Sequence, residues 1–215
     1  MAEMSRVRIF VDFWNFQLQW NRCHTALGSG LIQIPWKEIP AILTAEISKG
    51  QPARFAGIHV YASIAPDNPK DRNLSKWLHH TLASYPGYSV EVKERKSRAH
   101  SVRCQDEGCQ EVITSCPKCD KELRITVEKG IDAAIITDLI SMAFDGNYDM
   151  AILVSGDADY APAVQYIQKK TDRQIVQAFF KQHGDQLRTA CWDHIFFEDM
   201  FQKFDLSAVD KPLSK

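Results

Sequence analysis

The sequence predicts an α/β fold in which helices cover both faces of a mainly parallel sheet. Met150–Val154 is short, apolar throughout and bounded by turn residues, which is typical of a strand buried on both faces. The segment before it, from Ile131 to Ala143, has apolar residues at helical spacing. Predicted strands and helices alternate along most of the chain, which is the pattern of parallel strands joined by crossover helices.

The remaining elements are assigned from the same two periods. Apolar-rich runs bounded by turn residues predict strands at Val7–Val11, Phe55–Ile64, Tyr88–Val92, Ile125–Val127, Gln174–Phe180 and near His194–Phe197. Apolar residues at helical spacing predict helices over residues 16–26, 39–47, 71–85, 161–170, 184–191 and 198–204. Pro35 fits the first turn of the second helix, and Pro40 leaves its start open. Lys93–Leu123 is polar and interrupts the alternation.

Composition limits the class of protein. A chain of 215 residues with 45% hydrophobic and 25% charged residues is typical of a globular α/β domain. The formal net charge of −1 excludes a general polyanion binder, so contact with nucleic acid requires a local basic patch. The apolar run after the amino terminus is too short for a signal peptide, and no apolar run is long enough to span a membrane. We therefore expect a cytoplasmic protein without a membrane partner.

Acidic residues lie at the ends of two predicted strands. Asp12 ends the first strand, and Asp157 follows Met150–Val154 through Ser155 and Gly156. If these strands are neighbours, both carboxylates lie at the carboxyl edge of the sheet, where open α/β sheets bind ligands. Asp132 at the start of the helix and Asp159 join the same candidate cluster.

Several carboxylates in one cleft repel each other unless a cation neutralises them. Oxygen ligands favour Mg²⁺ or Mn²⁺, and such an ion can activate water for hydrolysis of a phosphodiester. Asn15 is placed to hold a carboxylate or a metal-bound water, and Lys129 to meet a substrate phosphate or pair with an acid. Asp132 and Asp159 are also compatible with a purely structural role as helix N-caps.

Three motifs carry a family resemblance. Asp12-x-x-Asn15, Lys129-Gly-x-Asp132 with Asp138, and Ser155-Gly-Asp157-x-Asp159-Tyr160 followed by Pro162 resemble the NYN domain. This is a PIN-like nuclease family, and the sequence is most similar to its LabA-like branch. The resemblance spans most of residues 6–180, and its most specific part is the Ser-Gly-Asp-x-Asp-aromatic motif.

The resemblance implies a PIN-like three-layer α/β/α fold and Mg²⁺- or Mn²⁺-dependent cleavage of RNA. It maps the metal-binding acids of the family onto Asp12, Asp132, Asp157 and Asp159. The chain departs from the family in two ways. Phe13-Trp14 stands where many relatives have Gly after the first Asp, and a cysteine-containing segment is inserted. We expect residues 1–215 to form a single nuclease domain with this insertion at about 98–123.

The insertion predicts a structural zinc site. Cys104, Cys109, Cys116 and Cys119 lie within a short segment, and Cys-Pro-Lys-Cys resembles a zinc knuckle. In a reducing compartment clustered cysteines are more often metal ligands than disulfides. Zinc would fold a segment that has almost no apolar core of its own, with His100 as a substitute ligand. Loose or redox-active thiols are the alternative.

The flank of the insertion is the most basic part of the chain. Its candidate substrate-binding residues are Arg95, Lys96, Arg98 and Arg103. They could guide a polyanion backbone toward the acids, or they could only be the solvated charges of a strand edge. Trp14, close to Asp12, is a candidate platform for stacking of a base, although a tryptophan near a strand end is commonly part of a core.

The sequence therefore predicts a metal-dependent ribonuclease with RNA as the main partner and homo-oligomers as an open possibility. Two alternatives use the same fold: a DNA nuclease, because no residue is assigned to a 2′-hydroxyl, and a non-catalytic module that binds RNA or protein. Retention of four acids counts against the second. A phosphatase with an Asp-x-Asp nucleophile is disfavoured because Asp12-Phe13-Trp14 lacks the second acid.

Overall fold

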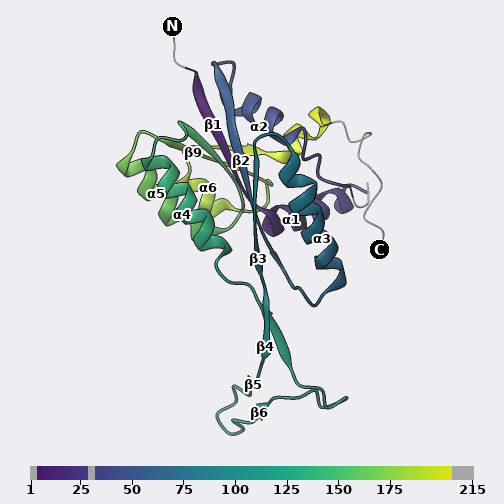
Figure 1. Ribbon diagram of the computed structural model, residues 1–215. Helices are drawn as coiled ribbons and strands as arrows, with labels where there is room; N and C mark the ends of the chain where they lie inside the picture. The colour runs from purple at the N-terminus through teal and green to yellow at the C-terminus, as the bar shows by residue number, and fades with distance from the viewer. Residues whose placement is uncertain (1–3, 29–31, 205–215) are drawn as a thin grey trace.

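A six-stranded parallel sheet forms the centre of the molecule. The computed structural model describes residues 4–28 and 32–204. The strand order is β10-β9-β8-β1-β2-β3, and every neighbouring pair is parallel (Figure 1). The strands are β1 (Ser5–Asp12), β2 (Ala53–Ile64), β3 (Tyr88–Glu94), β8 (Met150–Val154), β9 (Gln174–Phe179) and β10 (Asp193–Phe196).

Helices cover both faces of this sheet, which gives the expected three layers. One face carries α1 (Phe13–Ala26), α2 (Ile39–Ser48) and α3 (Pro69–His80). The other carries α4 (Ile131–Phe144), α5 (Ala161–Lys170) and α6 (Asp185–Ala190) (Figure 1). The described residues also form three short 3₁₀ helices: η1 (Leu82–Ser84), η2 (Ala158–Tyr160) and η3 (Phe197–Lys203).

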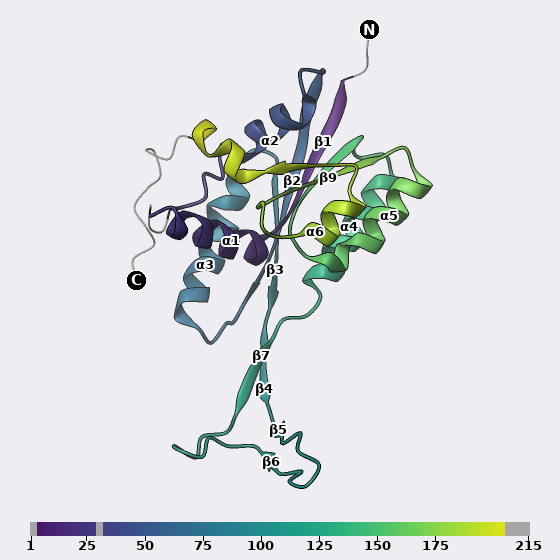
Figure 2. The same ribbon diagram turned by 180° about the vertical axis from the view of Figure 1, so that it is seen from behind.

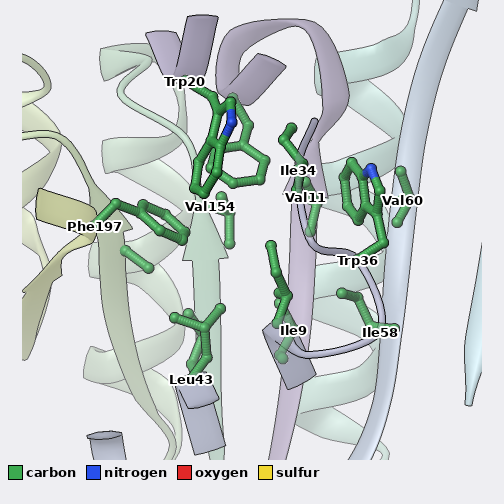
Figure 3. Close-up of a cluster of buried hydrophobic side chains, with 14 of the residues drawn as sticks. Ile9, Val11, Trp20, Ile34, Trp36, Leu43, Ile58, Val60, Val154 and Phe197 are labelled. Carbon is green, nitrogen blue, oxygen red and sulfur yellow. The ribbon is translucent and has the colours of Figure 1, made fainter. Parts of the chain in front are cut away.

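The central strands are apolar on both faces, as parallel strands between two helical layers require. Along β1, Ile9 and Val11 pack with Trp20, Trp36 and Leu43 on the α1–α3 side (Figure 3). Phe10 points to the opposite side and belongs to the core beneath α4 and α5. Because side chains alternate along a strand, Asp12 follows Phe10 toward the α4 side.

Most predicted boundaries are confirmed to within a few residues, and the differences have local causes. The second helix begins at Ile39, so Pro40 lies in its first turn and Pro35 lies outside it. The third helix ends at His80 and is followed by η1, so the predicted helix over 71–85 is shorter than expected. The last predicted helix is the 3₁₀ helix η3 rather than an α-helix.

Residues 96–127 project from the sheet as an arm (Figures 1 and 2). Its stalk is an antiparallel ribbon of β4 (Lys96–Ala99) and β7 (Arg124–Val127), and its tip contains the hairpin of β5 (Val102–Arg103) and β6 (Val112–Ile113). The arm continues from the carboxyl end of β3. The prediction that Ile125–Val127 resumes the main α/β alternation is therefore wrong, because this strand pairs only with β4.

An ion-pair cluster fixes the amino end of β1. The Asp149 carboxylate accepts hydrogen bonds from the Arg6 backbone N–H at 2.8 Å and from Arg6 Nε at 3.0 Å. Arg173 Nη1 lies 2.5 Å from Asp149 Oδ1. Hydrogen bonds from Arg6 are the main cause that lowers the pKa of Asp149 to about 2, against an opposing effect of burial. The carboxylate therefore ties β1, β8 and the start of β9 together.

Replacement of Asp149 by Asn should destabilise the protein by about 2 kcal/mol at pH 7, the usual contribution of hydrogen bonds to a charged group. The folded-state pKa of Asp149 is lowered, so its stabilisation is complete above the pKa of the unfolded chain and is lost as pH falls toward 2. Urea unfolding of both proteins should give a difference that shrinks as pH falls from about 4 toward 2. A difference independent of pH would show that the ionised carboxylate is not what stabilises this cluster.

Candidate acidic site

The pairing of β1 with β8 brings two polar turns together at the carboxyl edge of the sheet. Val11 pairs with Val154, so the chain leaves both strands at the same level. Asp12 caps α1, and its Oδ1 accepts a hydrogen bond from Asn15 N at 3.2 Å. Asn15 Oδ1 accepts in turn from Gly156 N at 2.9 Å. The side chain of Asn15 thus links the turn of Asp12 to the turn that carries Asp157.

Glycine is required at position 156 because the turn is tightly packed. A Cβ atom added there would lie 2.2 Å from Phe179 Cε1, and this ring is buried. Close approach of the Phe179 ring excludes any larger residue without displacement of the core. The glycine of the Ser155-Gly-Asp157 motif therefore has a steric cause, and Asp157 follows at a fixed position.

Asp12 and Asp132 converge on one tyrosine hydroxyl. Tyr160 Oη lies 3.2 Å from Asp12 Oδ2 and 2.9 Å from Asp132 Oδ1. Tyr160 ends η2 and is fully buried, whereas Asp132 stands in the first turn of α4 and is exposed. The Tyr160 hydroxyl therefore brings together two carboxylates from elements that are far apart in the sequence.

The surroundings of the acidic pair disfavour ionisation of Asp12. The pKa of Asp12 is raised to about 6, mainly by burial and also by the charges of Asp132 and Glu128, against the hydrogen bonds of Asn15 and Tyr160. Burial and the same two aspartates also raise the pKa of the Tyr160 hydroxyl. Across residues 4–28 and 32–204, no ion pair involves Asp12 or Asp132. Oxygen donors with an uncompensated negative charge are the chemistry that suits a hard divalent cation.

Asp157 and Asp159 lie in the adjoining turn but are not part of this pair. Asp157 Oδ1 accepts a hydrogen bond from Asp159 N at 3.0 Å and so caps η2. Asp157 is half-buried, and Asp159 is exposed. Within the described residues, no three His, Cys, Asp or Glu side chains come close enough together to hold a metal ion. The structure therefore gathers two of the four proposed acidic ligands, with the other two one turn away.

A profile of the NYN domain matches residues 6–198 of the chain, which is most of its length. The chain belongs to the NYN domain family. NYN domains are generally nucleases, so the acidic edge lies in a protein of a nuclease family. No curated protein gives a significant match.

A solved structure has the same fold as this NYN domain. It is the crystal structure of a protein of unknown function from Vibrio parahaemolyticus RIMD 2210633, with a TM-score of 0.55 and 21% sequence identity. The similarity covers 93% of this chain and 96% of the other. At this identity the similarity supports the three-layer fold alone.

The NYN domain contains two site residues that the sequence alone does not assign. Tyr160 appears in the sequence analysis only as the aromatic residue of a motif, but its hydroxyl contacts both acids. Glu128 follows β7 at the base of the arm, and its charge contributes to the raised pKa of Asp12. Glu128 stands directly before the Lys-Gly-x-Asp motif in the sequence. The antiparallel pairing of β7 with β4 places it at the base of the arm. Asp138 instead accepts a hydrogen bond from Tyr61 Oη at 2.6 Å, which fixes α4 on β2.

The predicted substrate-binding residues lie around the acidic site and along the arm. Arg95 lies over the Trp14 ring, with its guanidinium carbon 4.9 Å from the ring centroid. Lys96 and Arg98 are two positions apart in β4, and both side chains are exposed. Their cross-strand partners are Val127 and Ile125, so both cations lie on one face of the stalk. Arg103 lies farther out, in β5, and Lys129 is exposed beside Gly130 at the start of α4.

The four clustered cysteines, Cys104, Cys109, Cys116 and Cys119, lie in two similar turns at the tip of the arm. The residue after each second cysteine has a left-handed backbone, with φ of 46° at Gln110 and 54° at Asp120. Backbone N–H groups of Lys118 and Cys119, together with the Cys119 thiol, lower the pKa of the Cys116 thiol. All six cysteines of the chain are free thiols in the structure. The two pairs of thiols are not gathered into one metal-binding group.

In the described part of the chain, no helix is long and apolar enough to cross a membrane.

The raised pKa of Asp12 predicts that the acidic site destabilises the metal-free protein. The folded-state pKa lies above that of the unfolded chain, so folding becomes less favourable as pH rises from about 4 to 6. Asp12→Asn keeps the N-cap acceptor and removes the buried charge. It should stabilise the protein by about 1–3 kcal/mol at pH 7.5 in EDTA, because one pKa unit corresponds to about 1.4 kcal/mol.

Urea unfolding at several pH values measures this effect. The gain should disappear below about pH 4, where Asp12 is protonated in both states. Asp145→Asn, at the exposed carboxyl end of α4, is the control and should change little. A variant at position 12 that is no more stable than the wild type at pH 7.5 would contradict the interpretation.

Proposed function

We propose that this NYN domain is a divalent-metal-dependent ribonuclease that hydrolyses RNA at the acidic edge of its sheet. The observation that carries the proposal is the convergence of Asp12 and Asp132 on Tyr160, with Asp12 buried and its pKa raised to about 6. A site of this kind disfavours its own charge until a cation arrives. Membership of a family that generally consists of nucleases supports the same conclusion. The similarity to the LabA-like branch remains a prediction.

Asp12 and Asp132 would hold Mg²⁺ or Mn²⁺, with Asp157 and Asp159 available from the neighbouring turn. When bound, such an ion supplies positive charge that stabilises a phosphodiester during hydrolysis. The protein groups position these acids: Asn15 connects the two turns, and Tyr160 connects the two carboxylates. The family comparison supports a divalent metal only in general terms, so Mg²⁺ and Mn²⁺ are both proposed.

The basic residues at the base of the arm are proposed to guide the substrate. Arg95, Lys96 and Arg98 extend from the acidic edge along the stalk, where they could contact successive phosphates. The tip favours no such role, because residues 104–120 contain four acids (Asp106, Glu107, Glu111 and Asp120) and one lysine. Substrate guidance is therefore assigned to the stalk and to Lys129, with Arg103 at its outer end.

Two other functions use the same surface. A DNA nuclease would use the same acids, and a non-catalytic module would bind RNA or protein through the stalk. Burial of an uncompensated acid favours catalysis over binding alone, because negative charge repels a polyanion unless a cation is bound. A cytoplasmic location, and a single domain that carries the arm as an insertion, complete the proposal.

Neutralisation of the acids provides the first test. Asp132→Asn and Asp157→Asn should each lower Mn²⁺-dependent cleavage of a fluorescent RNA on the order of a hundredfold, as loss of transition-state charge stabilisation does. Neither residue is fully buried, so the fold should survive, which circular dichroism can verify. Asp145→Asn at the other end of α4 is a matched control with expected wild-type rates. Wild-type cleavage by Asp132→Asn would exclude the proposed site.

We also propose that the arm tip binds Zn²⁺ through Cys104, Cys109, Cys116 and Cys119. The donor chemistry fits, because both cysteine turns have the left-handed residue and one has the amide donors of a metal knuckle. Binding of the ion would draw the two turns together. Without an ion the tip has almost no apolar core to hold the two turns together, because Val102, Val112 and Ile113 are exposed.

The zinc site is tested by metal analysis of the purified protein. Cys116→Ser and Cys119→Ser should each remove about one equivalent of zinc, because structural zinc sites use four protein ligands. Cys191→Ser, at the end of α6, should leave the zinc content unchanged. Equal zinc content in all four proteins, or none in the wild type, would remove zinc from the proposal.

A further inference from the structure

A second cluster of functional side chains adjoins the acidic pair. It consists of Trp14, Ser63, Arg95 and Glu128, and is called the Trp14–Glu128 cluster. These residues come from the first turn of α1, the end of β2 and the two legs of the arm. The cluster adjoins the acidic pair along the chain, because Trp14 stands two residues after Asp12 in the first turn of α1 and Glu128 stands four residues before Asp132. A nucleotide next to the reacting phosphate could therefore reach it.

The cluster is rigid on its inner side. Trp14 Nε1 donates a hydrogen bond to the Ser63 carbonyl at 2.6 Å, which fixes the indole plane. Arg95 stacks on that plane, and its Nε lies 2.8 Å from Ser63 Oγ and 3.2 Å from Glu128 Oε2. The Ser63 hydroxyl also contacts Glu128 Oε2. One edge of the guanidinium and one oxygen of the carboxylate are thus used internally.

The outer side of the same groups is available. The Arg95 side chain is 24% exposed and the Glu128 side chain 40% exposed. In the part of the chain that the structure describes, the terminal nitrogens of Arg95 and Oε1 of Glu128 have no hydrogen-bond partner. A planar guanidinium held on a tryptophan is a platform for a base, as stacking on Arg is common in recognition of single-stranded RNA. A carboxylate oxygen next to it can accept a hydrogen bond from a ribose hydroxyl.

We propose that the Trp14–Glu128 cluster is a ribonucleotide-binding subsite that distinguishes RNA from DNA. The base stacks on the outer face of Arg95, with Trp14 beneath it. Glu128 Oε1 accepts a hydrogen bond from the 2′-hydroxyl of the same nucleotide, a group that deoxyribose lacks. The inference deepens the proposed nuclease function and rests on it for the position of the substrate. It supplies the 2′-hydroxyl contact that the sequence leaves unassigned.

The test measures binding without cleavage. The full-length protein in EDTA is titrated into a fluorescent single-stranded RNA and into DNA of the same sequence with deoxyuridine for thymidine. The wild type should bind the RNA about tenfold more tightly, the lower end for a hydrogen bond to a charged group. Glu128→Ala should bring the two affinities together, whereas Glu128→Gln keeps an acceptor oxygen and should retain the preference for RNA.

Two controls separate recognition from charge and from structure. Loss of a negative charge near the stalk reduces its repulsion of a phosphate backbone. Glu122→Ala on the arm should therefore strengthen binding of RNA and DNA equally and leave the ratio of the two affinities unchanged. Arg95→Lys keeps the charge but removes the planar stack, and should weaken binding of RNA and DNA alike. RNAs with a single deoxyribose at each position in turn should show one position that carries the preference.

Each outcome of the binding and cleavage measurements supports or overturns one of the two proposals. Equal affinity of the wild type for RNA and DNA, no measurable RNA binding, or an unchanged preference in Glu128→Ala each overturns the subsite. A Glu128-dependent preference without any cleavage in Mn²⁺ supports the subsite and contradicts the nuclease function. Cleavage of RNA without a Glu128-dependent preference supports the nuclease function and overturns the subsite. The two proposals can therefore fail separately.

Discussion

The parallel pairing of β1 with β8 is the constraint on which the acidic site depends. The pairing runs from Val7 with Met150 to Val11 with Val154, and both strands are buried from both faces. A slip of one residue would move every side chain to the other face, so the two apolar cores fix the register. This register places Asp12 beside the Ser155–Asp157 turn, and the Asn15–Gly156 hydrogen bond joins the two turns. Core packing and the position of the carboxylate therefore have the same cause.

The two ends of the central strands shift the pKa of a carboxylate in opposite directions. At the amino end Asp149 is neutralised by Arg6 and Arg173, and its pKa falls to about 2. At the carboxyl end the Asp12 carboxylate is buried next to other acids and forms no ion pair with a described residue, and its pKa rises to about 6. The first arrangement stabilises the fold, and the second opposes it. A buried charge that destabilises the fold is typical of positions where the residue serves function rather than stability.

The parts of the fold that depend on one period in sequence can be predicted, and parts that depend on long-range contacts cannot. Met150–Val154 is predicted with its observed bounds, because a short apolar run between turn residues suits a buried strand and is too short for a helix. Ile125–Val127 has a similar composition, yet it lies in the arm, because the sequence does not reveal which strand it pairs with. The same limit applies to the site. The strand ends predict Asp12 and Asp157 at one edge, but not the Tyr160 hydroxyl between two acids.

The arm shapes a site that lies at its base. Arg95 and Glu128 flank the arm directly, and these residues meet at Ser63 and Trp14, close to Asp12 in the chain. The antiparallel return of the arm therefore brings a cation and an acid together at the edge of the sheet, whatever the tip of the arm binds. No pattern in the sequence connects Arg95 to Glu128, since they stand 33 positions apart and the stalk alone brings them together.

The central claim is that Asp12 and Asp132 form the binding site of a divalent cation. An anomalous difference map of crystals soaked in Mn²⁺ tests it most directly, because it locates the ion without reference to activity. We predict a manganese peak between these two carboxylates, with Asp157 or Asp159 turned toward it. Ordered manganese elsewhere on the molecule, with no peak at this edge of the sheet, would contradict the account.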